Sequence, residues 1–410
     1  MMFLQFFIWG AFFVPLGGYL THLFAEKEGL NSIIGHIYGT SNWGALIAPL
    51  IVGLIADRFF NAERVNGILH LAGAVFLWYC STVTEAGAMF IGMLGFFICY
   101  MPTLPLANII AFRQLTETDR QFPAIRIWGT IGWIVSGLVV AESMFGLFHL
   151  PVLPGIENAG VTKFPILLSA AASLIYGIYS FTLPACPPQG KGKKASIGQL
   201  LGFDALGLFK DRSFAVFAIC SFLICIPLAF YYAQAYSFVS QVAFGEKSSA
   251  VMALGQVSEM GFLILIPFFL NRFGMKATMI AGMGAWALRY ALFGLMPTVP
   301  SMVLLGIVLH GICYDFFFVT GQLYTDKKAS PEIRASAQGL IGLLTYGAGM
   351  LVGNYVLGWW GDRIGLDPST AKGWTAGAAQ FWLLPAAISV VVAVLFTAMF
   401  RAPKRTISPA

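Results

Sequence analysis

Charged residues are scarce in this chain of 410 residues, and that scarcity narrows its class. Asp, Glu, Lys and Arg make up 10% of the sequence, whereas hydrophobic residues make up 58%. Soluble domains carry about a quarter charged residues, so too few are present here to cover a surface that faces water. The six cysteines show no paired spacing, and no His-Glu-x-x-His pattern of metal ligands occurs. The composition therefore excludes a disordered chain, a soluble enzyme, a nucleic-acid-binding module and a disulfide scaffold.

Apolar sequence, by contrast, is abundant and comes in runs long enough to cross a bilayer, which takes roughly 20 residues of helix. Such runs cover residues 3–24, 33–56, 67–84, 86–112, 124–141, 163–183, 213–238, 250–270, 277–296, 302–324, 336–360 and 375–400. They are continuous and too long for the alternating segments of a β-barrel. The first run lacks a basic segment and a cleavage site and is interpreted as a span. The sequence predicts an all-α membrane protein with twelve transmembrane helices.

The positive charges are distributed unevenly between the loops. If the N-terminus is inside, the cytoplasmic loops and tail hold 17 of the 24 Lys and Arg residues, and the outer loops hold 5. Cytoplasmic loops of membrane proteins carry an excess of Lys and Arg. We therefore expect both termini in the cytoplasm. The net charge of +6 then reflects topology and not affinity for nucleic acid.

A stretch rich in Pro, Gly and Lys after the sixth run indicates a linker between two halves. The predicted domains are a six-helix bundle over 1–184, a cytoplasmic linker over 185–212, a six-helix bundle over 213–400 and a cytoplasmic tail over 401–410. An internal repeat supports a duplication, because Pro123-Ala-Ile-Arg126 opens the fifth run and Pro331-Glu-Ile-Arg334 opens the eleventh. Secondary transporters are built from such duplicated halves, with the substrate site between them near the membrane midplane.

Several stretches carry a family resemblance. The loop after the second run contains Gly53, Asp57 and Arg58 at the spacing of a pattern found in the major facilitator superfamily. Longer similar stretches begin at Phe122, Leu201, Gln256, Tyr314 and Ser330. Through these stretches the chain resembles the nucleoside:proton symporter family of bacteria.

The resemblance implies a fold, a function and a location. It implies two pseudo-symmetric six-helix bundles and import of nucleosides coupled to protons, with no enzymatic activity and no cofactor besides the coupling proton. It also implies a place in the bacterial inner membrane, where we expect a monomer surrounded by lipid. By the superfamily pattern, Asp57 and Arg58 would lock the cytoplasmic loops in one conformational state and so act in gating.

Ionisable residues inside the apolar runs are the candidates for function, because a charge at bilayer depth costs about 3 kcal/mol even on lenient scales. Four residues stand out: Arg126, Glu259, Arg289 and Asp315. Glu259 follows Gln256 by three positions, so both side chains project from one helix face. They form either a carboxylate and an amide that bind substrate or a buried structural pair in contact with Arg289. Arg289 itself is interpreted as structural.

Asp315 lies among aromatic residues, next to Tyr314 and before Phe316. Burial favours the neutral form of a carboxyl group, and proton coupling requires a group that exchanges a proton near neutral pH. The alternative is an ion pair that joins two helices. His310 lies five residues earlier and either joins a proton relay or packs in the core.

Arg126, Thr130 and Trp133 share one helix face, because they lie four and seven positions apart. By the resemblance, the matching positions on this helix belong to the substrate site. The internal repeat offers an alternative, since the counterpart of Arg126 is Arg334, which lies in a cytoplasmic loop. Arg126 would then cap a helix or act in gating at the inner membrane edge.

A nucleoside requires partners for its hydroxyl groups, its base edge and its π-face. Glu259 and Asp315 can accept hydrogen bonds from ribose hydroxyls, and Gln256 can pair with a base edge. Aromatic side chains that can stack on the base are present at Trp133, Tyr231, Tyr232, Tyr314 and Phe318. A sugar would use the same carboxylates, so the residue types alone leave a sugar or polyol symporter open as the alternative.

The chain departs from the family's pattern at four positions. Ala229 and Tyr232 stand where the family has a Gln and an Asn, and Gln234 is the one amide nearby. Phe318 stands at a polar position of the family and His310 at an aromatic one. These departures leave the preferred base open.

Together these residues predict a proton-coupled importer that works by alternating access. Glu259 and Asp315 would bind substrate and proton while facing a water-accessible chamber shared by the two bundles. A membrane-embedded enzyme or a sensor is disfavoured, because the sequence shows no clustered nucleophiles and its linker is too short for an output domain.

Overall fold

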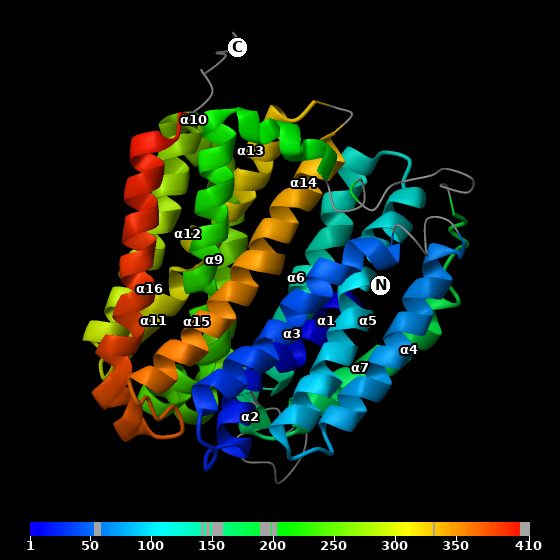
Figure 1. The fold of residues 1–410 in the computed structure, drawn as a ribbon. Coiled ribbons are helices and arrows are strands. Elements are labelled where there is room, and N and C mark those ends of the chain that lie inside the picture. Colours follow the sequence, from blue (N-terminus) through cyan, green and yellow to red (C-terminus); the bar gives the residue numbers. More distant parts are fainter. Residues whose placement is uncertain are drawn as a thin grey trace.

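The computed structural model describes residues 1–52, 59–140, 143–144, 148–149, 159–188, 198, 203–330 and 333–401. Nearly all of this part of the chain is helical (Figure 1). Two strands of two residues each, β1 (Ser143–Met144) and β2 (Phe148–His149), form one antiparallel pair. The predicted helical fold class is confirmed, and this short pair is the exception to it.

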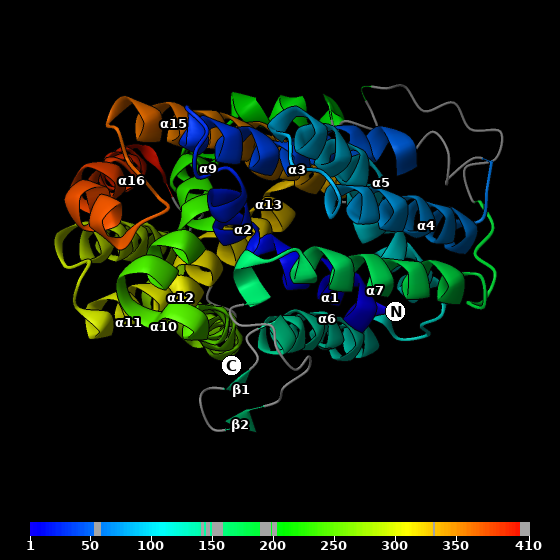
Figure 2. The same ribbon diagram turned by 90° about the horizontal axis from the view of Figure 1, so that it is seen from below.

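The first group of helices lies together on one side of the molecule (Figures 1 and 2). It comprises α1 (Met2–Phe13), α2 (Leu16–Leu23), α3 (Leu30–Ile51), α4 (Ala62–Cys80), α5 (Ala86–Arg113), α6 (Thr118–Val140), the 3₁₀ turn η2 (Ala159–Val161) and α7 (Phe164–Ser180). Within it, α1 packs against α6 and α7, and α5 packs against α3 and α4. Val14 and Pro15 separate α1 from α2.

The second group lies on the other side. It begins with η3 (Phe203–Lys210), α9 (Arg212–Val239), η4 (Ser240–Phe244), η5 (Gly245–Lys247) and α10 (Ser248–Leu295). It continues with α11 (Pro300–Val308), α12 (His310–Tyr314), η6 (Asp315–Val319) and α13 (Thr320–Lys328). It ends with α14 (Arg334–Gly342), η7 (Leu343–Gly349), α15 (Met350–Arg363) and α16 (Ala371–Met399). Here α16 packs against α9 and α10, and η6 packs against α10.

Six helical stretches of the described chain are long and apolar enough to cross a membrane. They are Met2–Leu23, Ala86–Arg113, Arg212–Leu295, Pro300–Lys328, Ser336–Arg363 and Ala371–Met399, with shorter apolar helices at Ala124–Val140 and Phe164–Ser180. The predicted runs 33–56 and 67–84 fall on α3 and α4, which are not among them. Polar residues explain the difference: Asn31 and Asn42 of α3 bond to the second group, and His70 of α4 bonds inside the first.

Helix α10 contains two of the predicted runs, because the chain turns within it. Gly274 has φ 80° and ψ 166°, a backbone conformation that residues with a side chain rarely adopt. Just beyond it, the Lys276 ammonium donates to the carbonyl oxygens of Thr397 and Phe400 at the end of α16. A cation is favourable at a helix C-terminus, so Lys276 fixes α10 and α16 against each other.

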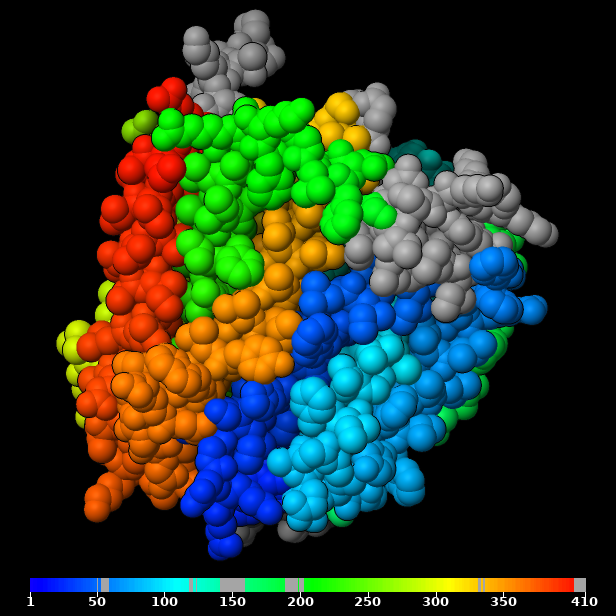
Figure 3. All heavy atoms as spheres, viewed as in Figure 1, coloured from blue at the N-terminus to red at the C-terminus, as the bar shows by residue number. Residues whose placement is uncertain are grey.

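The two groups meet where α15 lies against α3, which the space-filling view shows as orange against blue (Figure 3). Asp362 of α15 accepts hydrogen bonds from the backbone N–H groups of Asn31 and Ser32, each 3.1 Å long. These N–H groups belong to the first turn of α3 and have no partner within their own helix. Gly29, in the left-handed conformation before α3, has no side chain to cap them. A carboxylate of the second group therefore caps a helix of the first.

A second cap lies at the start of α9. The Asp211 carboxylate accepts from the backbone N–H of Phe214 at 2.9 Å and from the Lys328 ammonium at 2.7 Å. The hydrogen bond from Lys328, followed by the one from Phe214, lowers the pKa of Asp211 below its usual range. The Asp211 side chain is 39% exposed, so solvent screens the ion pair and most of the stabilisation comes from the cap.

Asp211→Ala is expected to reduce the free energy of unfolding by about 1 kcal/mol, the usual cost of losing an N-cap. Asp211→Asn keeps a cap oxygen and should lose less. Because the folded-state pKa is lowered, the contribution is present at neutral pH and is lost as the pH falls through that lowered value. Thermal unfolding of the purified protein in detergent, at neutral and acidic pH, measures both effects. Equal stability of the Ala variant and the wild type at neutral pH would contradict the assignment.

Candidate site between the two groups

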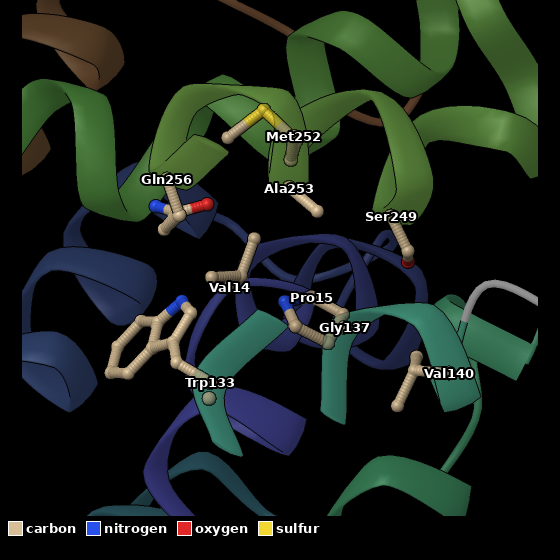
Figure 4. A pocket seen from close by; sticks show the side chains of 10 residues that line it. Val14, Pro15, Trp133, Gly137, Val140, Ser249, Met252, Ala253 and Gln256 are labelled. Atoms are coloured by element: carbon tan, nitrogen blue, oxygen red, sulfur yellow. The ribbon is translucent and has the colours of Figure 1, made fainter. Parts of the chain in front are cut away.

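A small pocket lies between the two groups of helices (Figure 4). Its lining comes from α1, the turn before α2, α6 and α10, and consists of Gly10, Val14, Pro15, Trp133, Gly137, Val140, Ser249, Met252, Ala253 and Gln256. Gly10 allows α1 to approach α6 closely, since a Cβ atom there would collide with Ser136 and Trp133. Trp133 of α6 and Gln256 of α10 lie across from each other near one end of the pocket (Figure 4). An aromatic ring and an amide predicted to bind substrate thus come from different groups of helices.

Glu259 lies one helical turn beyond Gln256 on α10. Its side chain is 28% exposed, and its Oε2 atom lies 3.9 Å from Nε2 of the buried His310 on α12. That distance is within ion-pair range but too long for a hydrogen bond. Glu259 therefore combines a partly exposed side chain with a buried histidine neighbour. The predicted alternative, a structural pair with Arg289, does not describe its surroundings, because Arg289 packs on Tyr231 and Trp286.

Arg126 of α6 is half-buried and lies over the Phe6 ring, with its guanidinium carbon 4.1 Å from the ring centroid. It interacts electrostatically with Glu259 and Tyr314, both of which belong to the second group. Thr130, one turn further along α6, is also half-buried. The structure thus brings a cation of the first group close to a carboxylate of the second.

Arg334, the counterpart of Arg126 in the internal repeat, has different surroundings. It begins α14, is about half exposed, and its Nε atom lies 3.2 Å from the Asp326 carboxylate. The repeat therefore does not place the two arginines in equivalent environments. The alternative that Arg126 only caps a helix at the membrane edge is disfavoured by its interactions with Glu259 and Tyr314.

Asp315 differs from Glu259 in exposure. Its side chain in η6 is fully buried, and neither carboxylate oxygen has a hydrogen-bond partner among the described residues. It interacts electrostatically with Glu259. Glu259 is therefore partly exposed, whereas Asp315 is enclosed in this conformation. That both carboxylates face a water-accessible chamber stays a prediction.

Aromatic side chains gather around these charges. The hydroxyl groups of Tyr314 and Tyr346 are hydrogen-bonded to each other, and the Phe318 ring lies 5.3 Å from that of Tyr314. The ring centroids of Tyr232 of α9 and Phe13 lie 5.7 Å apart. Those of Trp133 and Trp9 lie 5.4 Å apart, with the rings edge to face. All of the aromatic residues predicted to stack on a base thus have ring neighbours of their own.

Two of the surrounding segments, η6 and η7, are π-helical. Such widened turns are frequent at functional sites. They orient Asp315, Phe318 and Tyr346, and sequence reasoning missed Tyr346 because a π-turn has no clear sequence signal. Phe6 and Trp9 were also missed, since apolar residues in the first run resemble ordinary lipid-facing or core residues. For Tyr346, the only hint in the sequence was the cluster of glycines from Gly342 to Gly349 around η7.

The gating residues, the amide near the site and the possible metal ligands remain to be placed. Asp57 and Arg58, predicted to act in gating, lie outside the described residues. Gln234 donates to the Asn31 side chain at 3.1 Å, so it serves the contact between the two groups. Among the described residues, no group of three or more His, Cys, Asp or Glu could hold a metal ion.

Comparisons with known proteins show the family of the chain. The chain matches the family described as nucleoside H⁺ symporter over residues 1–405. The chain belongs to this family. It is 38% identical to the putative nucleoside transporter YegT of Escherichia coli K12, over 98% of this chain and 92% of that protein. It is 35% identical to the nucleoside permease NupG of the same strain, over 97% and 94%.

Solved structures give the same assignment. The crystal structure of NupG matches this fold with a TM-score of 0.82 at 33% identity, over 98% of both chains. A bacterial homologue of the lysosomal transporter Spinster shares the fold at 14% identity, with a TM-score of 0.73. As a member of the nucleoside H⁺ symporter family, this chain is a nucleoside transporter and not an enzyme. The predicted family and function are confirmed.

Proposed function

We propose that the protein imports nucleosides together with protons by alternating access, with the substrate held between the two groups of helices. The observation that carries this proposal is the electrostatic interaction of Arg126 from the first group with Glu259 and Tyr314 from the second. A substrate bound there contacts both groups at once. Its binding can therefore bias the equilibrium between conformations in which the groups are apart on one side or the other.

The proposal includes an arrangement in the membrane. The excess of Lys and Arg in alternate loops supports cytoplasmic termini in a bacterial inner membrane. The helices of 1–184 and 213–400 would form two six-helix bundles. The two bundles contain twelve spans if α3 and α4 also cross the membrane, with their polar residues shielded from lipid by neighbouring helices. In this orientation the contact of Asp362 with α3 lies on the outer side. We expect the monomer to be the transporting unit.

The side chains at the site suit the parts of a nucleoside. Glu259 can accept from ribose hydroxyls, and Gln256 can bond to a base edge. Trp133 and Tyr314 offer rings for stacking, and Tyr346 adds a hydroxyl next to that of Tyr314. Two groups can carry the coupled proton. One is the enclosed Asp315, whose carboxylate oxygens have no hydrogen-bond partner among the described residues, and the other is the partly exposed Glu259.

Uptake into proteoliposomes tests this proposal. Labelled uridine, adenosine, guanosine and xanthosine should enter vesicles that contain the protein, and an inward proton gradient of one pH unit should support accumulation of up to about tenfold for one proton per nucleoside. Labelled glucose and maltose are the controls for the polyol alternative. Absence of counterflow with every nucleoside, from a monodisperse preparation, would refute the proposed function. Accumulation of a sugar instead would favour the polyol alternative.

A further inference from the structure

Three buried side chains form a column that begins beside Glu259. The His310 Nε2 atom lies 3.9 Å from Oε2 of Glu259. The His310 ring stacks on Tyr231 with centroids 5.2 Å apart and planes 19° from parallel. The Arg289 guanidinium carbon lies 4.2 Å from the centroid of the same Tyr231 ring. The column therefore connects a buried cation to the accessible carboxylate of the site.

Arg289 is a permanent positive charge that makes few other stabilising contacts. Its Nε donates to the Gly306 carbonyl oxygen at 2.8 Å, while Nη1 and Nη2 have no hydrogen-bond partner among the described residues. Trp286 provides a second ring, 5.0 Å from the guanidinium. A buried guanidinium without a carboxylate is costly, and contacts with aromatic faces offset only part of that cost. Its field acts on the titratable group beyond Tyr231 in the column, which is His310.

His310 has one ring nitrogen directed at Glu259 and the other free of protein partners. Nδ1 is buried and has no hydrogen-bond partner in the described part of the chain, so no neighbour fixes the tautomer. In one neutral tautomer Nε2 donates a hydrogen bond, and in the other it accepts one. The same ring can therefore bind an ionised Glu259 as a donor and a protonated Glu259 as an acceptor.

We propose that His310 is a positioning residue that closes onto Glu259 when a nucleoside binds and holds its carboxyl group in both protonation states. The inference rests on the proposed function and assigns a role to a residue outside the substrate contacts. Contacts of this kind are often long in an empty site and shorten in the complex. Stacking on Tyr231, which Arg289 backs, sets the plane of the imidazole. Arg126 and Asp315 are the other charged groups that interact with Glu259.

The first test is nucleoside binding to the purified protein in detergent. His310→Phe keeps a ring on Tyr231 but removes both nitrogens, and is expected to raise the dissociation constant on the order of tenfold, the value of one hydrogen bond to a charged group. His310→Gln restores a donor and an acceptor and should recover most of the affinity. His36→Phe is the matched control, because His36 is exposed and lies against Tyr355 outside the site.

The second test asks whether His310 acts through Glu259. In a Glu259→Ala background, His310→Phe should add little further loss, because no side-chain group remains at position 259 for His310 to hold. A full tenfold loss in that background would show that His310 acts independently and would overturn the proposal.

An infrared measurement on the nucleoside complex gives an answer that does not depend on the size of the affinity. The carboxyl C=O stretch of protonated Glu259 is identified by its disappearance in Glu259→Gln, and with nucleoside bound it should shift in His310→Phe. An unshifted band in the complex would overturn this proposal and leave the proposed function standing. A wild type that binds no nucleoside at all would refute the proposed function and this proposal with it.

Discussion

Asp315→Asn is expected to keep nucleoside exchange across the membrane while abolishing accumulation driven by a proton gradient. The Asp315 side chain is fully buried, and its carboxylate oxygens have no partner among the described residues. An ionised carboxylate in such a place is costly. Loss of its proton must therefore accompany a rearrangement that exposes or pairs the group, and this requirement would tie protonation to the movement of the helices.

Asparagine has the size of a protonated carboxyl group but has no proton to release. Counterflow at equal pH should therefore stay close to the wild-type rate. The accumulation ratio under a gradient of one pH unit should fall from as much as about tenfold to about one. Proteoliposomes with the same amount of each variant, loaded with unlabelled nucleoside for counterflow or with buffer for accumulation, provide both measurements.

Asp326→Asn serves as the control for this experiment, because Asp326 is an exposed carboxylate that pairs with Arg334 at 3.2 Å. It should accumulate nucleoside as the wild type does. If Asp315→Asn still accumulates nucleoside, the coupled proton is carried by another group, and Glu259 is the next candidate. Loss of counterflow from a folded Asp315→Asn variant would instead make Asp315 a substrate ligand.

The candidate site could be predicted from the sequence because charges at membrane depth are costly and therefore rare. Arg126 and Glu259 stood out as charges in otherwise apolar runs, and in the structure they interact electrostatically across the two groups. The helical fold class followed from the same apolar runs. The spacing of Gln256 and Glu259 placed both on one face of α10, and both lie at the site.

Other features could not be predicted, because they depend on contacts between distant segments. Asn31 and Asp362 are far apart in the sequence, and neither belongs to a recognisable motif, yet they join α3 to α15. The stack of His310 on Tyr231 depends on how α12 and α9 pack, which no local pattern encodes. The same holds for Asn31 and Asn42 of α3, which are buried where they bond to the second group.

The contact of Asp362 with α3 predicts a large conformational effect. Asp362 accepts two backbone hydrogen bonds and a third, at 3.2 Å, from the Asn31 side chain. Asn31 in turn donates to the Leu366 carbonyl oxygen at 2.9 Å. These bonds must break when the two groups separate on this side. Asp362→Ala removes a charged cap supplied by the other group of helices and worth about 2 kcal/mol, so the ratio of the closed to the open form should fall on the order of 30-fold.

The change in the equilibrium between closed and open forms can be followed by labelling. The cysteine of an Ala253→Cys variant reacts with a membrane-impermeant maleimide added outside intact cells. Ala253 is buried and lines the pocket, and the six native cysteines are buried, so background labelling should be low. Adding Asp362→Ala should raise the labelling rate about 30-fold, and Asp362→Asn, which keeps an acceptor oxygen but no charge, should raise it less. Asp367→Ala is the matched control, because among the described residues that carboxylate bonds to Ser369 and Thr370 of its own loop and to no residue of the first group. An equal rate in Asp362→Ala and the control would mean that the cap does not hold this side closed, since a bond that both conformations keep cannot bias the equilibrium between them.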